Sequence, residues 1–100
     1  MPKYRMKPVV IEAFQVTRKS RQNNWNWPKW LHEAWQKDWP EVGAVSPVDW
    51  PNSKGDDRLQ VATLGGSLIV SWDGWIIQGV KGELYPINDD IFKETCEPVE

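Results

Sequence analysis

Three glycines divide the stretch from Ser71 to Pro86 into short runs of aromatic and β-branched residues. This punctuation is typical of β-hairpins, because Asp73-Gly74 can supply the positive φ that a tight turn between twisted strands requires. Gly79 and Gly82 predict a second reversal within the same stretch. The second half of the chain is therefore expected to form antiparallel β-structure.

The remaining apolar runs extend this expectation to a meander of about four strands. The expected strands cover residues 59–64, 67–71, 75–78 and 83–87, with a turn at Gly65-Gly66 between the first two. A fifth strand is predicted over residues 7–16, where Val9-Val10-Ile11 is followed by alternating polar and apolar residues. Residues 40–58 read as an irregular connection that holds one short strand, at 44–45 or 48–50.

One amphipathic helix is predicted between the first strand and the irregular connection. Its apolar residues recur at helical spacing, with Pro28 suited to the first helical position and Pro40 ending the helix after Trp39. A short helix over residues 90–95 follows a cap at Asn88 or Asp89. Residues 17–26 are polar without apolar periodicity and predict a loop. The apolar stripe of the longer helix consists of Trp27, Trp30, Leu31, Ala34 and Trp35.

These elements predict an α+β fold in a single domain over residues 1–100, with a small antiparallel sheet, one Trp-rich helix and a short C-terminal helix. A domain of this length buries only roughly two-thirds of its unfolded surface. Eight Trp in 100 residues exceed what so small a core encloses, so several indoles are expected at a surface, a pocket or a subunit interface. Both considerations favour a homo-oligomer.

The composition argues against several functional classes. The single Cys96 excludes a disulfide framework and a multi-cysteine zinc site. The lone His32 falls on the polar face of the predicted helix and reads as solvated. Apolar runs are too short for a membrane span or a signal-peptide core. We therefore expect no metal and no cofactor, no membrane association, and a cytoplasmic location in a host cell.

The charge is polarised along the chain although the net charge is only −2. Residues 1–22 hold six basic residues and one acidic residue, whereas residues 83–100 hold six acidic residues and one basic residue. In one interpretation the two ends attract each other within or between subunits. In the other, the basic first strand faces an anionic ligand. Nucleic acid is a less suitable partner, because a pI near 5.4 lacks the usual basic excess.

Three segments near the two ends of the sequence, 4–15, 75–86 and 90–99, carry a recognisable signature over about half of the chain. With these segments the chain resembles a group of short phage and prophage proteins of unknown function, some of which belong to a family named for a Pro-Gly-Asp-Tyr-Gly motif. One departure is that Trp72-Asp73-Gly74 stands where such proteins usually have Pro-Gly-Asp before an aromatic residue. The resemblance implies a phage context and brings no reaction, cofactor or catalytic residue with it.

Binding without catalysis is the function that these features favour. No nucleophile or acid/base pair stands out, whereas aromatic surfaces and cations are abundant. One hypothesis is an anti-defence protein that sequesters a small anionic, nucleotide-like ligand as an oligomer. The other is an accessory protein that docks on a host or phage protein through a Trp-rich surface. The predicted ligand-binding residues are Arg5, Lys7 and Lys81 for charge, Trp75 and Tyr85 for stacking, and Gly79 and Gly82 for backbone N–H groups near a phosphate.

Overall fold

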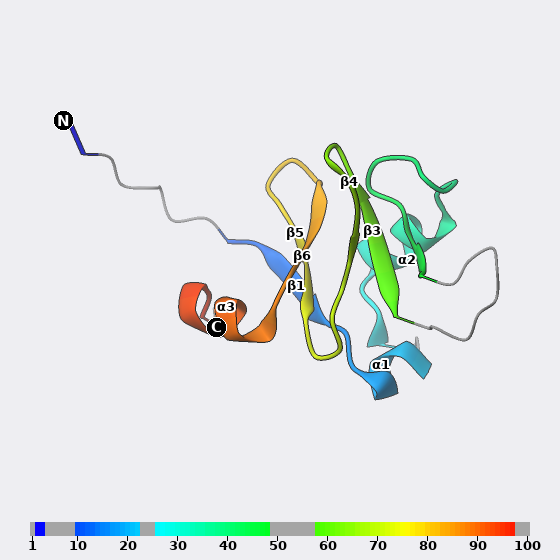
Figure 1. Cartoon of the computed structure of the whole chain (residues 1–100), viewed down its shortest axis with the longest axis horizontal. Helices are drawn as coiled ribbons and strands as arrows, with labels where there is room; N and C mark the ends of the chain where they lie inside the picture. The colour runs from blue at the N-terminus through cyan, green and yellow to red at the C-terminus, as the bar shows by residue number, and fades with distance from the viewer. Residues whose placement is uncertain (1, 4–9, 23–25, 49–57, 98–100) are drawn as a thin grey trace.

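The computed structural model describes residues 2–3, 10–22, 26–48 and 58–97 (Figure 1). It confirms the α+β class. The elements, in chain order, are β1 (Glu12–Gln15), α1 (Arg18–Gln22), α2 (Lys29–Gln36), β2 (Val45–Pro47), β3 (Leu59–Thr63), β4 (Gly66–Ile69), β5 (Trp75–Gln78), β6 (Leu84–Ile87) and α3 (Asp89–Thr95).

The strands form two antiparallel sheets of three strands each, so the prediction of one sheet with a continuous meander was wrong. One sheet has the order β1-β5-β6 and the other the order β2-β3-β4. The predicted hairpins exist, with Thr63 opposite Gly66 in one and Gln78 opposite Leu84 in the other. Strands β4 and β5 do not pair with each other, because the chain changes sheets between them.

The change of sheet takes place in the turn Ser71–Gly74. The Gly74 N–H donates to the Ser71 carbonyl at 2.8 Å, and Asp73 between them has a φ of 67°. A type II turn requires a positive φ at its third residue. Asp is one of the few residues other than glycine that adopt this conformation. The positive φ therefore falls on Asp73, and the turn joins two sheets instead of two paired strands.

Val16 fastens this turn to the end of β1. Its N–H donates to the Gly74 carbonyl at 2.8 Å, and its carbonyl accepts from the Asp73 N–H at 2.7 Å. The Gln15 side-chain amide adds a bond of 3.0 Å to the Asp73 carbonyl. Val16 is 1% exposed. The end of β1 is thereby bonded to the turn in which the chain passes from the sheet that contains β4 to the sheet that contains β5.

Residues 18–22 form helix α1, where the sequence predicted a polar loop. Thr17 and Ser20 cap its start reciprocally, since each backbone N–H donates to the other's hydroxyl, at 2.8 and 3.0 Å. Two cation–π contacts connect it to the rest of the fold, from Arg18 to Trp72 at 4.7 Å and from Arg21 to Trp35 at 5.2 Å. Capping and tertiary aromatic contacts replace the apolar stripe that a helix of this kind normally needs.

Helix α2 confirms the prediction of an amphipathic helix but ends three residues before the predicted Trp39. Lys37 has an extended backbone, and its N–H reaches only the Ala34 carbonyl, at 3.3 Å. Leu31 and Ala34 are buried, whereas Trp35 is 37% exposed at the edge of the stripe.

The hydrophobic core lies between the two sheets and α2 (Figure 1). Strand β6 packs beside β3, so that Leu84 of one sheet and Val61 of the other belong to one cluster. Trp27 enters this cluster ahead of α2, with its indole N–H bonded to the Ser20 carbonyl at 2.7 Å. The other buried members are Val16, Leu31, Ala34, Val45, Leu59, Val70 and Ile76.

We predict that Gly74→Ala destabilises the fold. An added Cβ would lie 2.9 Å from the Ser71 carbonyl oxygen and 3.2 Å from the Ile87 carbonyl oxygen, both backbone atoms that cannot turn aside. We expect the free energy of unfolding in urea to fall by about 1–3 kcal/mol.

Gly65→Ala is the matched control. Its added Cβ would approach only the Thr63 hydroxyl, at 3.9 Å, and we expect a change within about 0.5 kcal/mol. Equal midpoints for Gly74→Ala and Gly65→Ala would show that the Ser71–Gly74 turn is not closely packed.

Candidate functional site

A cleft lies between the end of α2 and strand β2. Its volume is about 500 Å³, within the range typical of small-molecule sites. The walls are mostly apolar, with Lys37 and Asp38 as the charged groups. The lining residues are Trp35, Lys37, Asp38, Trp39, Val45, Ser46 and Pro47.

Trp35 is held in place by aromatic and cationic neighbours. Its ring meets the buried Trp27 ring edge-on, with centroids 5.6 Å apart, and the Arg21 guanidinium stands over it. Such contacts restrict the rotation of an exposed indole. One wall of the cleft is therefore a positioned aromatic ring with a cation beside it.

The early end of α2 opens the cleft. Because the helix stops at Gln36, Lys37, Asp38 and Trp39 leave its axis and lie opposite β2. Gly43, with a φ of 92°, then turns the chain back toward β2 and lets the Lys37 ammonium approach, since a Cβ at that position would lie 3.0 Å from Nζ.

The floor of the cleft is fixed by β2. Val45 is 1% exposed, and the Ser46 hydroxyl donates to the Pro47 carbonyl at 3.2 Å. The Gln60 side-chain amide donates to both the Ser46 hydroxyl and the Pro47 carbonyl, each at 3.1 Å. The polar groups of this strand are thus tied to one another.

A second hollow, of about 150 Å³, lies on the other side of Lys37. Trp30, Glu33 and Gln78 contribute to its lining. The Trp30 indole N–H is buried without a hydrogen-bond partner among the described residues. This hollow is too small for more than a few atoms, so the α2–β2 cleft is the stronger candidate site.

The structure separates the residues predicted to bind an anion. Arg5 and Lys7 lie outside the described residues. Trp75 begins β5, whereas Gly79, Lys81 and Gly82 follow its far end. A strand of four residues spans roughly 13 Å, so one small ligand cannot contact Trp75 and the β5–β6 turn together.

The β5–β6 turn already contains an anionic group. The Glu83 carboxylate accepts from the Lys81 N–H at 3.0 Å and fills the space where a Cβ on Gly79 would stand. The Gly79 N–H donates to the Glu83 carbonyl, and the Gly82 N–H to the Gly79 carbonyl. Phosphate binding by this turn stays a prediction, but both glycine N–H groups are engaged within the turn.

Trp75 and Tyr85 also differ in what they offer a ligand. The Trp75 ring is stacked on Phe92 of α3, with centroids 3.9 Å apart and planes 11° from parallel. Tyr85 lies opposite Ile77 and is 39% exposed. One face of Trp75 is thus covered by the protein itself, and Tyr85 remains open.

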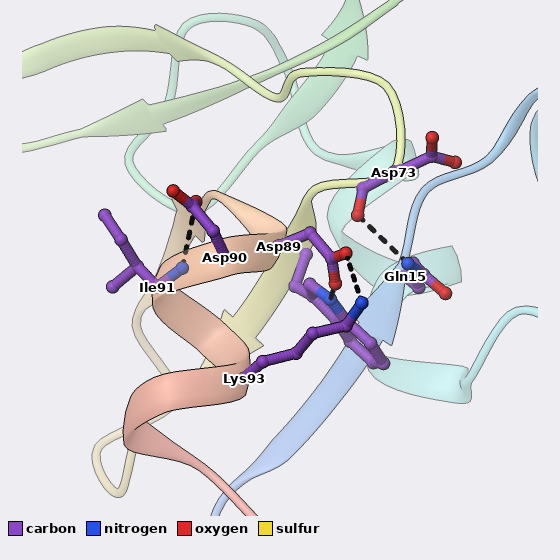
Figure 2. Close-up of polar contacts among 7 residues, drawn as sticks. Gln15, Asp73, Asp89, Asp90, Ile91 and Lys93 are labelled. Atoms are coloured by element: carbon purple, nitrogen blue, oxygen red, sulfur yellow. Dashed lines mark hydrogen bonds and ion pairs between the residues drawn. The ribbon is translucent and has the colours of Figure 1, made fainter.

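Trp75 also anchors α3 to the first sheet (Figure 2). Its indole N–H donates to one Asp89 carboxylate oxygen at 2.9 Å, and Lys93 lies 3.0 Å from the other. The Trp75 hydrogen bond, and then Lys93, lower the pKa of Asp89 below its ordinary value. Helix α3 begins at Asp89, one residue earlier than predicted, with Asn88 at the N-cap position.

The other titratable residues considered in the sequence lie away from the cleft. His32 is half-buried beside the Trp27 ring, at 5.7 Å between ring centroids. The prediction that His32 is solvated was therefore only partly correct. Cys96 is half-buried next to Thr95. Within the described ranges, no three His, Cys, Asp or Glu side chains come together as metal ligands. None of the helices described there is long and apolar enough to span a bilayer.

No protein-family model, curated protein or solved structure matches this chain. The candidate site therefore rests on its own geometry.

We predict that the docking of α3 is sensitive to acid. A lowered pKa in the folded state means that ionised Asp89 contributes stability above its unfolded pKa, and that this contribution is lost as the pH falls through the folded pKa. In an NMR titration, the Trp75 indole N–H resonance should move with a midpoint below the ordinary Asp value.

Asp89→Asn should abolish that titration, because the amide keeps a hydrogen-bond acceptor for Trp75 but cannot ionise. Asp90→Asn is the matched control, since among the described residues the Asp90 carboxylate accepts a hydrogen bond from the neighbouring Ile91 N–H and from no other group (Figure 2). An unchanged titration in Asp89→Asn would place the responsible group elsewhere.

Proposed function

We propose that this protein binds a small planar anion in the α2–β2 cleft and does not convert it. The observation that carries the proposal is the combination, in one cleft of about 500 Å³, of two indoles with apolar walls and a lysine. Small-molecule sites combine the same elements, an apolar pocket with a few convergent polar groups.

The preference for a planar ligand follows from Trp35 and Trp39. Indole rings offer large flat faces at low entropic cost, and stacking of a base on an aromatic side chain contributes about 1–3 kcal/mol. Pro47 adds a further apolar side chain to the lining. Trp35 is already held by Trp27 and Arg21, so little ordering is needed on binding.

The preference for an anion follows from Lys37. Its side chain is the one cation among the described residues that line the cleft, and Asp38 is the one anion. A phosphate or carboxylate group on the ligand would pair with the Lys37 ammonium.

The absence of conversion follows from the groups that line the cleft. Its one hydroxyl, on Ser46, is bonded to Pro47 and Gln60 and not to a general base. An activated nucleophile needs such a base within hydrogen-bond reach. His32 and Cys96 are not among the lining residues. The cleft therefore supports retention of a ligand better than a reaction.

The phage resemblance gives this binding a biological setting. A phage-encoded protein that retains a nucleotide-like ligand in the host cytoplasm would act as an anti-defence protein by sequestering a signal. The cleft supports this role with Trp35 and Trp39 in place of the predicted Trp75 and Tyr85. Assembly into a homo-oligomer belongs to the same proposal.

Equilibrium dialysis against a panel of linear and cyclic nucleotides tests the proposal. One compound should be depleted by the folded protein and returned intact after denaturation and chromatography. Lys37→Glu should weaken its retention by tenfold or more, because repulsion replaces attraction. Trp35→Ala should weaken it by a similar factor.

Lys81→Glu, in the β5–β6 turn, is the matched control for Lys37→Glu and should leave retention unchanged. Loss in Lys81→Glu alone would return the site to the residues predicted from the sequence. Recovery of a new product would show that the protein is an enzyme. If no nucleotide is retained, the proposal fails, and docking of a host or phage protein on the Trp-lined cleft becomes the better hypothesis.

A further inference from the structure

Strand β4 lies at the edge of its sheet and is exposed along its whole length. The order β2-β3-β4 leaves it with β3 as its one hydrogen-bonded neighbour in the described part of the chain. All four of its residues are exposed, including Leu68 at 47% and Ile69 at 48%. Two large apolar side chains, one on each face of the strand, thus stand half in solvent.

The backbone of β4 also has groups left over for pairing. The Val70 N–H donates to the Leu59 carbonyl just after the strand ends. Because bonded and non-bonded pairs alternate in an antiparallel ladder, Leu68 points its backbone groups toward Val61 of β3. The N–H and carbonyl groups of Ser67 and Ile69 then point away from β3, toward the open edge.

This edge carries none of the devices that usually prevent pairing. Exposed edges are commonly protected by charged residues, proline or a bulge. Strand β4 reads Gly-Ser-Leu-Ile, and its register with β3 is continuous. Strand β6 lies beside β4 but is not hydrogen-bonded to it. An uncharged strand without proline or a bulge is fitted to accept another strand.

We propose that a second copy of this chain pairs with β4 in antiparallel orientation, with Leu68 at the twofold axis. The strand is self-complementary in this register, because Ser67 and Ile69 flank Leu68 symmetrically and both point outward. Ser67 of each copy exchanges two hydrogen bonds with Ile69 of the other, which gives four in all. The β2-β3-β4 sheets of the two copies then form one continuous sheet of six strands.

Further exposed apolar residues lie close enough to enlarge this contact. Four residues of strand alone cover much less than the roughly 800 Å² that each partner contributes to a stable interface. Leu64, at the tip of the β3–β4 turn, is 94% exposed, and Val80, in the β5–β6 turn, is 69% exposed. Both turns lie at the same end of the molecule (Figure 1), and β4 lies beside β6.

A second copy suits this edge better than an unrelated segment. No charge on β4 repels an identical strand. The interface leaves the α2–β2 cleft free, because β2 and β4 are opposite edges of one sheet. It extends the proposed function by naming the oligomer contact, and it does not depend on the ligand.

Light scattering of the full chain between 1 and 100 μM, a range on the order of weak to moderate dimer affinities, tests the contact. The wild type should reach dimer mass, whereas Leu68→Lys should stay monomeric, because two like charges would meet at the axis. Ile91→Lys is the matched control: Ile91 is 45% exposed on α3, away from β4, and the variant should remain dimeric.

Cross-linking tests the register. In a Cys96→Ser background, Leu68→Cys should form a disulfide-linked dimer on mild oxidation, because residue 68 faces itself across the axis. Leu64→Cys, although more exposed, should cross-link much more slowly, because it lies off the axis.

A monomeric wild type at the highest concentration overturns the inference, as does equally fast cross-linking through Leu64→Cys. Circular dichroism and a thermal melt show whether Leu68→Lys is folded. Nucleotide retention by monomeric Leu68→Lys separates the two proposals, since the cleft should still bind when the dimer is lost.

Discussion

The fold depends on the pair of hydrogen bonds between Val16 and the turn Ser71–Gly74. These bonds, of 2.7 and 2.8 Å, join residues more than fifty positions apart and continue the pairing of β1 with β5 into the turn before β5. The turn also carries the chain out of the second sheet, whose last ladder bond comes from Val70 to Leu59. Both sheets are therefore positioned by this one connection, in which Val16 and Gly74 are buried.

The candidate site follows from this connection through the aromatic cluster. Thr17 starts helix α1 directly after Val16, and the Ser20 carbonyl of that helix accepts the Trp27 indole N–H. Trp27 in turn contacts Trp35 edge-on at the wall of the cleft. A displacement of Val16 would therefore shift helix α1, then Trp27, and through Trp27 the Trp35 ring at the cleft.

Much of the local structure was predictable from the sequence. Glycine-bounded β-branched runs located β3 to β6, and apolar residues at helical spacing located α2. Short-range hydrogen bonding and packing of one face produce such patterns. Helix α1 was missed because five residues show no periodicity. Its signal was the pair Thr17 and Ser20, which cap each other across the first turn.

The division into two sheets and the position of the cleft were not predictable in the same way. Asp73-Gly74 signals a turn, but only its bonding to Val16 decides that β4 and β5 belong to different sheets. The cleft joins the end of α2 to β2, about ten residues further on, through tertiary packing. The distance between the residues predicted to bind an anion has a related cause, since β5 separates Trp75 from Lys81 and Glu83 occupies the turn.

Native-state hydrogen exchange of the backbone amides tests the central claim most directly. If the Val16 connection holds both sheets together, the amides of Val16, Asp73 and Gly74 exchange only when the whole domain unfolds. Their opening free energies should then equal the free energy of unfolding measured in denaturant. Opening free energies well below that value, with the β3 amides still fully protected, would show that the turn opens independently and would contradict this account.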